Sequence, residues 1–183
     1  MADINEKFRK VVRNGFEIEL KALLNDPDCN ALAKDIYGTT ALMFAAIGKC
    51  EACLEILLPV SDGLAKDDIG ITALMWAARN GNDVCVGMLL PVSDPLDKDY
   101  NGMTALMHAA MYGKDACVEV LLPVSDASAK NAAGRTASNV ARLRTHEGLA
   151  QFIDGYVLAQ GERAVIDVAL CPVASQWKAA RRI

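Results

Sequence analysis

The chain has 183 residues and is 52% hydrophobic, so it is long enough to bury a core. Its longest apolar run, 41–47, is far shorter than the ~20 residues of a membrane span, and its first residues lack the pattern of a secretory signal. The first 154 residues hold 15 Lys and Arg against 21 Asp and Glu, whereas the last 29 hold four basic and two acidic residues. We therefore expect no membrane insertion and no nucleic-acid binding, which needs a basic stripe.

Two phrases recur in the chain at a fixed step of 32 residues. Leu-Leu-Pro-Val-Ser-Asp begins at positions 57, 89 and 121, and a Gly-x-Thr-Ala-Leu-Met phrase begins at positions 38, 70 and 102. A fixed step of roughly 20–50 residues is typical of proteins built from stacked repeats. Such stacks usually present a binding surface, so the repeat also bears on function.

The unit 66–97 shows what one repeat contains. Its first residues, 66–70, predict a tight turn, because Asp and Gly favour reversals and Gly accepts a positive φ. Thr72 then predicts the N-cap of a short helix over 73–79. The recurrent Lys-Asp pair that opens each turn is interpreted as structural, because it returns at every step.

A second helix is predicted over 84–90, where Pro91 ends it because proline has no N–H to donate. Helices of seven or eight residues are not stable alone, so each unit must bury its apolar face against the next copy. The expected fold is therefore all-α, a solenoid of helix-turn-helix units with short β-turn fingers.

The register extends the array beyond the three full copies. A truncated copy precedes them and a more polar copy follows them, as expected of terminal repeats that face water. We predict a repeat domain over 1–154 and a C-terminal helix (160–170) with a basic tail over 155–183. The predicted subdivisions of the repeat domain are an N-terminal cap at 3–33, full repeats at 34–65, 66–97 and 98–129, and a C-terminal cap at 130–154.

At these residues the chain resembles the ankyrin repeat family, whose pattern is Asp-x-x-Gly-x-Thr-x-Leu-x-x-Ala-Ala, then Asn-Gly, then Leu-Leu. The best copy meets this pattern from Asp67 to Leu90, and the resemblance covers roughly residues 3–154. It implies a protein-interaction module that binds its partner through turn tips and inner helices, on the concave face.

Positions that differ between copies are free of the demands of the repeat and are our candidates for partner binding. They collect aromatic, Met and Arg residues, the types enriched at the centres of protein interfaces. The predicted partner-binding residues are Tyr37, Phe44, Ile69, Trp76, Arg79, Tyr100, Met103, His108, Met111 and Tyr112.

Three of the six cysteines, Cys53, Cys85 and Cys117, follow the 32-residue step and are interpreted as small buried residues and not as part of a disulfide framework. Free cysteines favour a reducing compartment. Cys50 and Cys53 form a Cys-x-x-Cys, and Cys50 is expected at a helix N-terminus, where its thiol pKa can fall. The two histidines, His108 and His146, have no ligand or catalytic partner at the required spacing.

We expect a non-enzymatic, cytoplasmic scaffold with no catalytic residues, no cofactor and no metal. Delivery into a host cell as an effector is an open alternative for its location. Two alternative functions are a regulatory or inhibitory subunit whose C-terminal tail docks on the repeat body, and a thiol sensor acting through Cys50. The expected state is a monomer, with a dimer through the C-terminal segment as the alternative.

Overall fold

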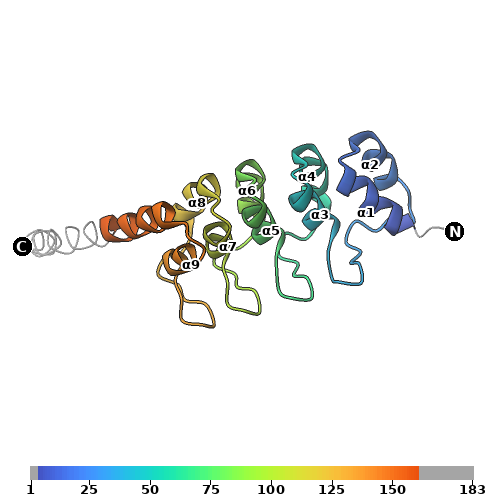
Figure 1. The fold of residues 1–183 in the computed structure, drawn as a ribbon. Coiled ribbons are helices and arrows are strands. Elements are labelled where there is room, and N and C mark those ends of the chain that lie inside the picture. Colours follow the sequence, from blue (N-terminus) through green and yellow to red (C-terminus); the bar gives the residue numbers. More distant parts are fainter. Residues whose placement is uncertain (1–3, 161–183) are drawn as a thin grey trace, which may run out of the picture.

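The computed structural model describes residues 4–160, which form pairs of helices stacked along one axis (Figure 1). The odd-numbered helices make one row, the even-numbered helices make a second, and long loops project from the odd-numbered row (Figure 1). All regular structure in this part of the chain is helical. The α-helices are α1 (Ile4–Asn14), α2 (Glu17–Leu24), α3 (Ala41–Gly48), α4 (Glu51–Leu57), α5 (Ala73–Asn80), α6 (Asp83–Leu89), α7 (Ala105–Met111), α8 (Asp115–Leu121) and α9 (Ala137–Leu143). Short 3₁₀ turns follow three of them, η1 (Leu58–Val60), η2 (Leu90–Val92) and η3 (Leu122–Val124), and residues 147–160 are helical.

The repeated threonines begin the inner helices, as the sequence predicts. The hydroxyls of Thr40, Thr72 and Thr104 accept hydrogen bonds of 3.4, 3.3 and 3.3 Å from the backbone N–H three residues later. Each bond satisfies one of the N–H groups that a helix start leaves unpaired. At the other end of α5, Gly81 adopts a positive φ of 74° and ends the helix.

Pro91 has a different place from the one predicted. Helix α6 ends at Leu89, and Pro91 lies in the first turn of η2. The N–H that proline lacks would have no partner within the helix at this position. The proline therefore continues the chain in a tighter turn and does not terminate the α-helix directly.

Alanine pairs set the distance between neighbouring odd-numbered helices. Ala45–Ala46, Ala77–Ala78 and Ala109–Ala110 are completely buried, and they lie where α3, α5 and α7 contact one another. Small side chains allow helix backbones to approach closely. Leucines at the repeated positions, including Leu74 and Leu106, fill the space between the rows with no exposed area.

A lysine ladder joins each repeat to the next at the base of the loops. The ammonium of Lys34 donates to the backbone oxygen of Lys66 at 2.8 Å, that of Lys66 to Lys98 at 3.2 Å, and that of Lys98 to Lys130 at 3.0 Å. Lys66 also pairs with Asp97 at 2.8 Å. These bonds confirm the structural interpretation of the repeated Lys-Asp pairs.

Four of the cysteines among residues 4–160 fall into two pairs, and one pair departs from the prediction. Cys85 and Cys117 are buried thiols, and burial raises the pKa of each to about 11, so they act as core residues. Cys53 is buried as expected, but the prediction that it remains a free thiol was wrong, because it forms a disulfide with Cys50. Cys50 is the N-cap of α4, so its side chain turns back over the first turn toward Cys53, and the Cα atoms are 5.2 Å apart.

Several predictions concern residues outside the described part of the chain. They are the helix predicted over 160–170, apart from its first residue, and the basic tail after it. Within the described part, helix 147–160 follows α9 and buries Leu149, Ala150 and Ile153 against the stack.

Candidate partner-binding surface

Each loop that projects from the stack carries a turn, here called a finger, organised by one side chain. In the fingers at 35–39, 67–71 and 99–103, the first carboxylate oxygen (Oδ1) of the leading aspartate accepts two backbone N–H groups. The distances are 2.9 and 2.8 Å for Asp35, 3.1 and 2.8 Å for Asp67, and 2.9 and 2.8 Å for Asp99. In the finger at 131–135, the amide oxygen of Asn131 accepts the same pair at 3.0 Å each. The finger therefore needs an oxygen at this position but not a charge.

The second carboxylate oxygen distinguishes the fingers from one another. The indole N–H of Trp76 donates to Oδ2 of Asp67 at 3.1 Å, and Nε2 of His108 lies 3.0 Å from Oδ2 of Asp99. Both partners come nine residues after their aspartate. Nine residues after Asp35 the chain has Phe44, whose side chain has no polar atom and cannot make this bond. No other described residue donates to Oδ2 of Asp35 either.

His108 is neutral in this arrangement. Burial lowers its pKa from the ordinary value, and this effect outweighs the hydrogen bond and the charge of Asp99, which act to raise it. A carboxylate only accepts, so Nε2 carries the hydrogen and donates to Asp99. Nδ1 is then the acceptor of the ring, and it is buried with no hydrogen-bond partner among the described residues.

Guanidinium groups stack on the aromatic rings of this surface. The guanidinium carbon of Arg79 lies 4.9 Å from the ring centroids of both Trp76 and Tyr112, so Arg79 joins two neighbouring repeats. Arg13, at the same repeat position on α1, lies 4.6 Å from the ring centroid of Phe44. Such cation–π contacts are favourable by about 0.5–1 kcal/mol at exposed sites.

A pocket of about 390 Å³ opens between α1, α3, α5 and the first two fingers. Apolar and aromatic side chains form most of its wall, and the fingers contribute the carboxylates among its lining residues. It is lined by Arg13, Asp35, Tyr37, Thr39, Phe44, Ile47, Asp67, Asp68, Ile69 and Trp76.

The structure brings four of the predicted partner-binding residues into this one pocket, namely Tyr37, Phe44, Ile69 and Trp76. Tyr37 and Ile69 are exposed on the fingers and Trp76 is half-buried on α5. Phe44 is only 7% exposed and forms part of the floor.

The other six predicted residues lie nearer the C-terminal end of the surface. Tyr100 is 75% exposed at a finger tip, Tyr112 is exposed at the end of α7, and Arg79 and Met111 are half-buried. Met103 and His108 are 8% and 6% exposed, so they support the surface and offer little area for direct contact.

Six residues of the pocket are not among the predicted binding residues, namely Arg13, Asp35, Thr39, Ile47, Asp67 and Asp68. Arg13 occupies the register position of Arg79, and that correspondence could have found it. Asp35 and Asp67 repeat with the unit, and repetition identifies a structural role in the turns without revealing what the second carboxylate oxygen does. Thr39, Ile47 and Asp68 stand at positions that vary between copies, but they are not aromatic, Met or Arg residues.

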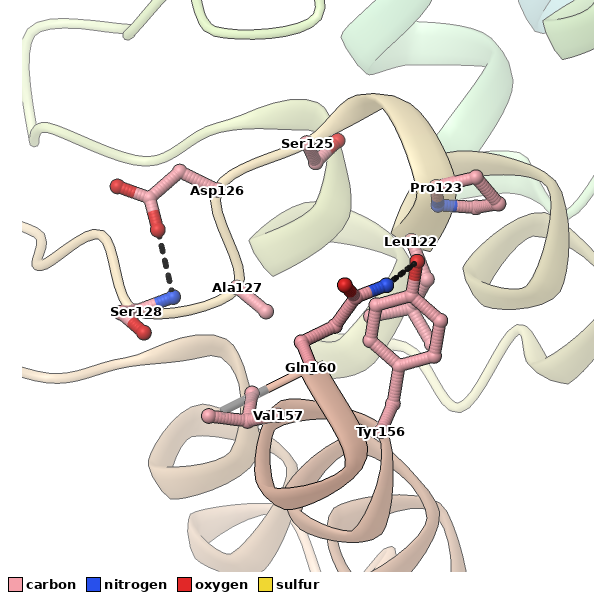
Figure 2. A pocket seen from close by; sticks show the side chains of 9 residues that line it. All are labelled: Leu122, Pro123, Ser125, Asp126, Ala127, Ser128, Tyr156, Val157 and Gln160. Carbon is pink, nitrogen blue, oxygen red and sulfur yellow. Dashed lines mark hydrogen bonds between the residues drawn. The ribbon is translucent and has the colours of Figure 1, made fainter. Parts of the chain in front are cut away.

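A larger hollow of about 520 Å³ lies at the other end of the stack (Figure 2). Tyr156, Val157 and Gln160 of the last helix face the loop 122–128 across it, and Gln160 donates to the hydroxyl of Tyr156 at 3.0 Å. The corresponding loop of an earlier repeat is covered by the next copy, where the Ser93 hydroxyl donates to the oxygen of Gly63 at 3.2 Å. We interpret this hollow as the space that remains where a helix replaces the next loop.

Residues 4–160 contain neither a metal-binding group nor a helix suited to cross a membrane. No group of three or more His, Cys, Asp or Glu side chains in this range has the arrangement needed to hold a metal ion. None of its helices combines the length and the hydropathy that a membrane crossing requires.

The stacked helix pairs with fingers on one row define a helical repeat solenoid of the kind that binds partners along its length. A family model described as Ankyrin repeats (3 copies) matches residues 9–99 and 60–132. The chain belongs to the ankyrin repeat family, whose members are generally protein–protein interaction modules and typically have no enzymatic activity. A comparison with curated proteins found no match.

Proposed function

We propose that this protein binds a protein partner through the concave surface made by its fingers and inner helices, and that it acts as a non-enzymatic scaffold. The observation that carries the proposal is the exposure of Tyr37, Tyr100 and Tyr112 along one surface, on a frame whose repeated alanines and leucines are buried. Exposed tyrosines supply large contact area at low conformational cost, and they are enriched at protein interfaces.

The arrangement of charges and rings supports the same proposal. Arg79 is held between Trp76 and Tyr112, and Arg13 is held on Phe44, so these side chains are ordered before a partner arrives. Ordering in advance lowers the entropy that binding costs.

The proposal is tested by capture of partners on the immobilised chain, with a triple variant Tyr37→Ala, Tyr100→Ala and Tyr112→Ala. A matched control, Ile18→Ala, Val84→Ala and Val92→Ala, removes exposed apolar side chains from the outer helices and their loops. We expect the tyrosine variant to lose a partner that the wild type and the control both retain. Equal capture by all three proteins, with unchanged thermal unfolding, would show that this surface does not bind the partner.

The Cys50–Cys53 disulfide favours a second candidate, a thiol sensor. Cys29, Cys85 and Cys117 are free, which favours a reducing compartment such as the cytoplasm, where disulfides are usually transient or redox-sensing. In the proposed step, the two thiols are oxidised to the disulfide by glutathione disulfide, which is reduced to two glutathione molecules. Mass spectrometry after alkylation across a glutathione redox series tests this step. A pair that stays oxidised or stays reduced at every cytosolic ratio contradicts it.

The remaining alternative, a regulatory subunit whose C-terminal tail docks on the body, depends on residues outside the described part of the chain. It stays a prediction, and so does a dimer through that segment.

A further inference from the structure

The pocket between the first two fingers carries excess negative charge. Three of its side chains are carboxylates, those of Asp35, Asp67 and Asp68, and one is a guanidinium, that of Arg13. The Asp67 carboxylate is already occupied by three donors, the N–H groups of Ile69, Ile71 and the Trp76 indole. The unmet acceptor capacity therefore lies at Asp35 and Asp68.

Oδ2 of Asp35 lacks a donor, whereas Oδ2 of the equivalent aspartate is bonded in both of the following fingers. Trp76 and His108 occupy the second oxygen of Asp67 and Asp99, and Phe44 cannot do the same for Asp35. The missing donor is a specific departure from the repeat, and it falls in the pocket that Tyr37, Phe44 and Trp76 line.

The chemistry of the pocket selects a planar cation. A guanidinium donates in-plane hydrogen bonds to a carboxylate and places its face against aromatic rings, whereas an ammonium is a compact, strongly hydrated point charge. This surface already holds two guanidinium groups against rings, Arg79 between Trp76 and Tyr112 and Arg13 on Phe44.

We propose that this pocket binds an arginine side chain of the protein partner, with Oδ2 of Asp35 as its acceptor and the rings of Tyr37 and Trp76 as its walls. The assignment rests on the proposed function, because it specifies what the partner presents to the same surface. Charge complementarity supports it, because the pocket is lined by three acidic side chains and one basic one.

The test uses two small probes, N-acetyl-arginine methylamide and its citrulline counterpart, which has nearly the same shape and no charge. Titrations of the full chain are followed through the backbone N–H signals of Tyr37 and Ile69 and the indole N–H of Trp76. We expect millimolar, saturable binding of the arginine probe, about tenfold tighter than citrulline, since a charge-assisted hydrogen bond is roughly twice as strong as a neutral one. Equal affinities, or no shifts with the arginine probe, would overturn the proposal.

Two variants separate the carboxylate from the fold. Asp35→Asn keeps the finger, because Asn131 supports the same turn in the fourth finger, and it should weaken arginine binding by about tenfold. Phe44→His introduces the residue found nine positions after Asp99, which should occupy Oδ2 of Asp35 and also weaken the probe. Arginine affinity unchanged in folded Asp35→Asn overturns the assignment.

A third variant tests the resident cation. Arg13→Ala removes a like charge from the pocket and should tighten arginine binding severalfold, and weaker binding counts against the proposal. Failure here is distinguishable from failure of the proposed function. If partner capture still depends on the three tyrosines while the arginine probe fails, only the arginine assignment is lost. If the triple tyrosine variant captures the partner as well as the wild type does, the proposed function is contradicted as well.

Discussion

The first finger and the two that follow it have the same backbone but a different connection to the helix behind them. In the second and third fingers, Trp76 and His108 tie the aspartate to α5 and α7, whereas Phe44 of α3 leaves the first aspartate without that tie. The difference separates two functions of one residue. One carboxylate oxygen builds the turn in all three of these fingers. The other bonds the helix behind it in the second and third fingers and lacks that bond in the first.

The same division runs through the whole stack. The repeated positions form the frame: threonine caps, alanine pairs, buried leucines and the lysine ladder. The positions that vary include those of the proposed binding surface, and most of them keep some exposure. Changes in the frame should act on stability, and changes at the varying positions should act on binding.

The sharpest contrast pairs a buried leucine with an exposed tyrosine of the same repeat. Leu106→Ala removes a fully buried side chain and should lower the free energy of unfolding by about 2–5 kcal/mol. Tyr100→Ala should change it by less than about 0.5 kcal/mol, because Tyr100 is exposed. Chemical denaturation of both variants measures the difference. A comparable loss in Tyr100→Ala would mean that the finger tip belongs to the frame.

The next largest effect compares the aspartates of the first two fingers. Asp67→Ala leaves the N–H of Ile71 buried and removes the bond from Trp76, and it should cost about 2–3 kcal/mol. Asp35→Ala removes two bonds in place of three and should cost about 1 kcal/mol less.

A double-mutant cycle assigns that difference to the indole. In a Trp76→Phe background, where the second finger has the same kind of ring as the first, Asp67→Ala should become less costly by about 1 kcal/mol. An unchanged cost would show that the ring packs beside the aspartate without contributing through its N–H.

His108 makes the third finger sensitive to pH. Its pKa is lowered in the folded state by burial, so the unfolded chain binds the proton more readily once the pH falls below about 6.5. The free energy of unfolding should therefore fall with decreasing pH, by at most about 1.4 kcal/mol per pH unit.

A suitable control replaces this histidine with the residue of the second finger. His108→Trp keeps an N–H donor at the position but cannot titrate, and the difference between the two denaturation series isolates the imidazole. Parallel pH dependences of the two proteins would contradict a neutral, buried His108.

The smallest predicted effect concerns the lysine ladder. Lys66→Met keeps the apolar stem and removes the bonds to Asp97 and to the Lys98 oxygen, and it should cost about 0.5 kcal/mol because the pair is partly exposed. The exposed Lys21→Met on α2 is the matched control. Thermal unfolding in low and high salt should show the Lys66 effect shrinking as salt screens the pair. A salt-independent loss would point to packing of the stem.

The sequence predicted the frame well because each of its elements depends on residues close together in the chain. Thr72 and its helix, the turn at Asp67 and the stacking of copies follow from local patterns and a fixed step. The tie between Asp67 and Trp76 depends on where two separate elements meet in space, and the sequence alone did not reveal it. The bridge between Cys50 and Cys53 does not follow from the repeat register, which identifies Cys53 only as a core position. It depends on the closeness of an N-cap residue to the third residue of its helix.

The lysine ladder also bears on how such a protein changes over evolution. Each ammonium meets a backbone oxygen, which every residue possesses, so the joint between copies makes no demand on the side chain that follows. A duplicated segment of one repeat would meet the same joint on both of its sides. The array can therefore gain or lose whole fingers while the joints stay the same. Each copied aspartate finger adds a second carboxylate oxygen, which evolution can bond to the helix behind it or leave unbonded.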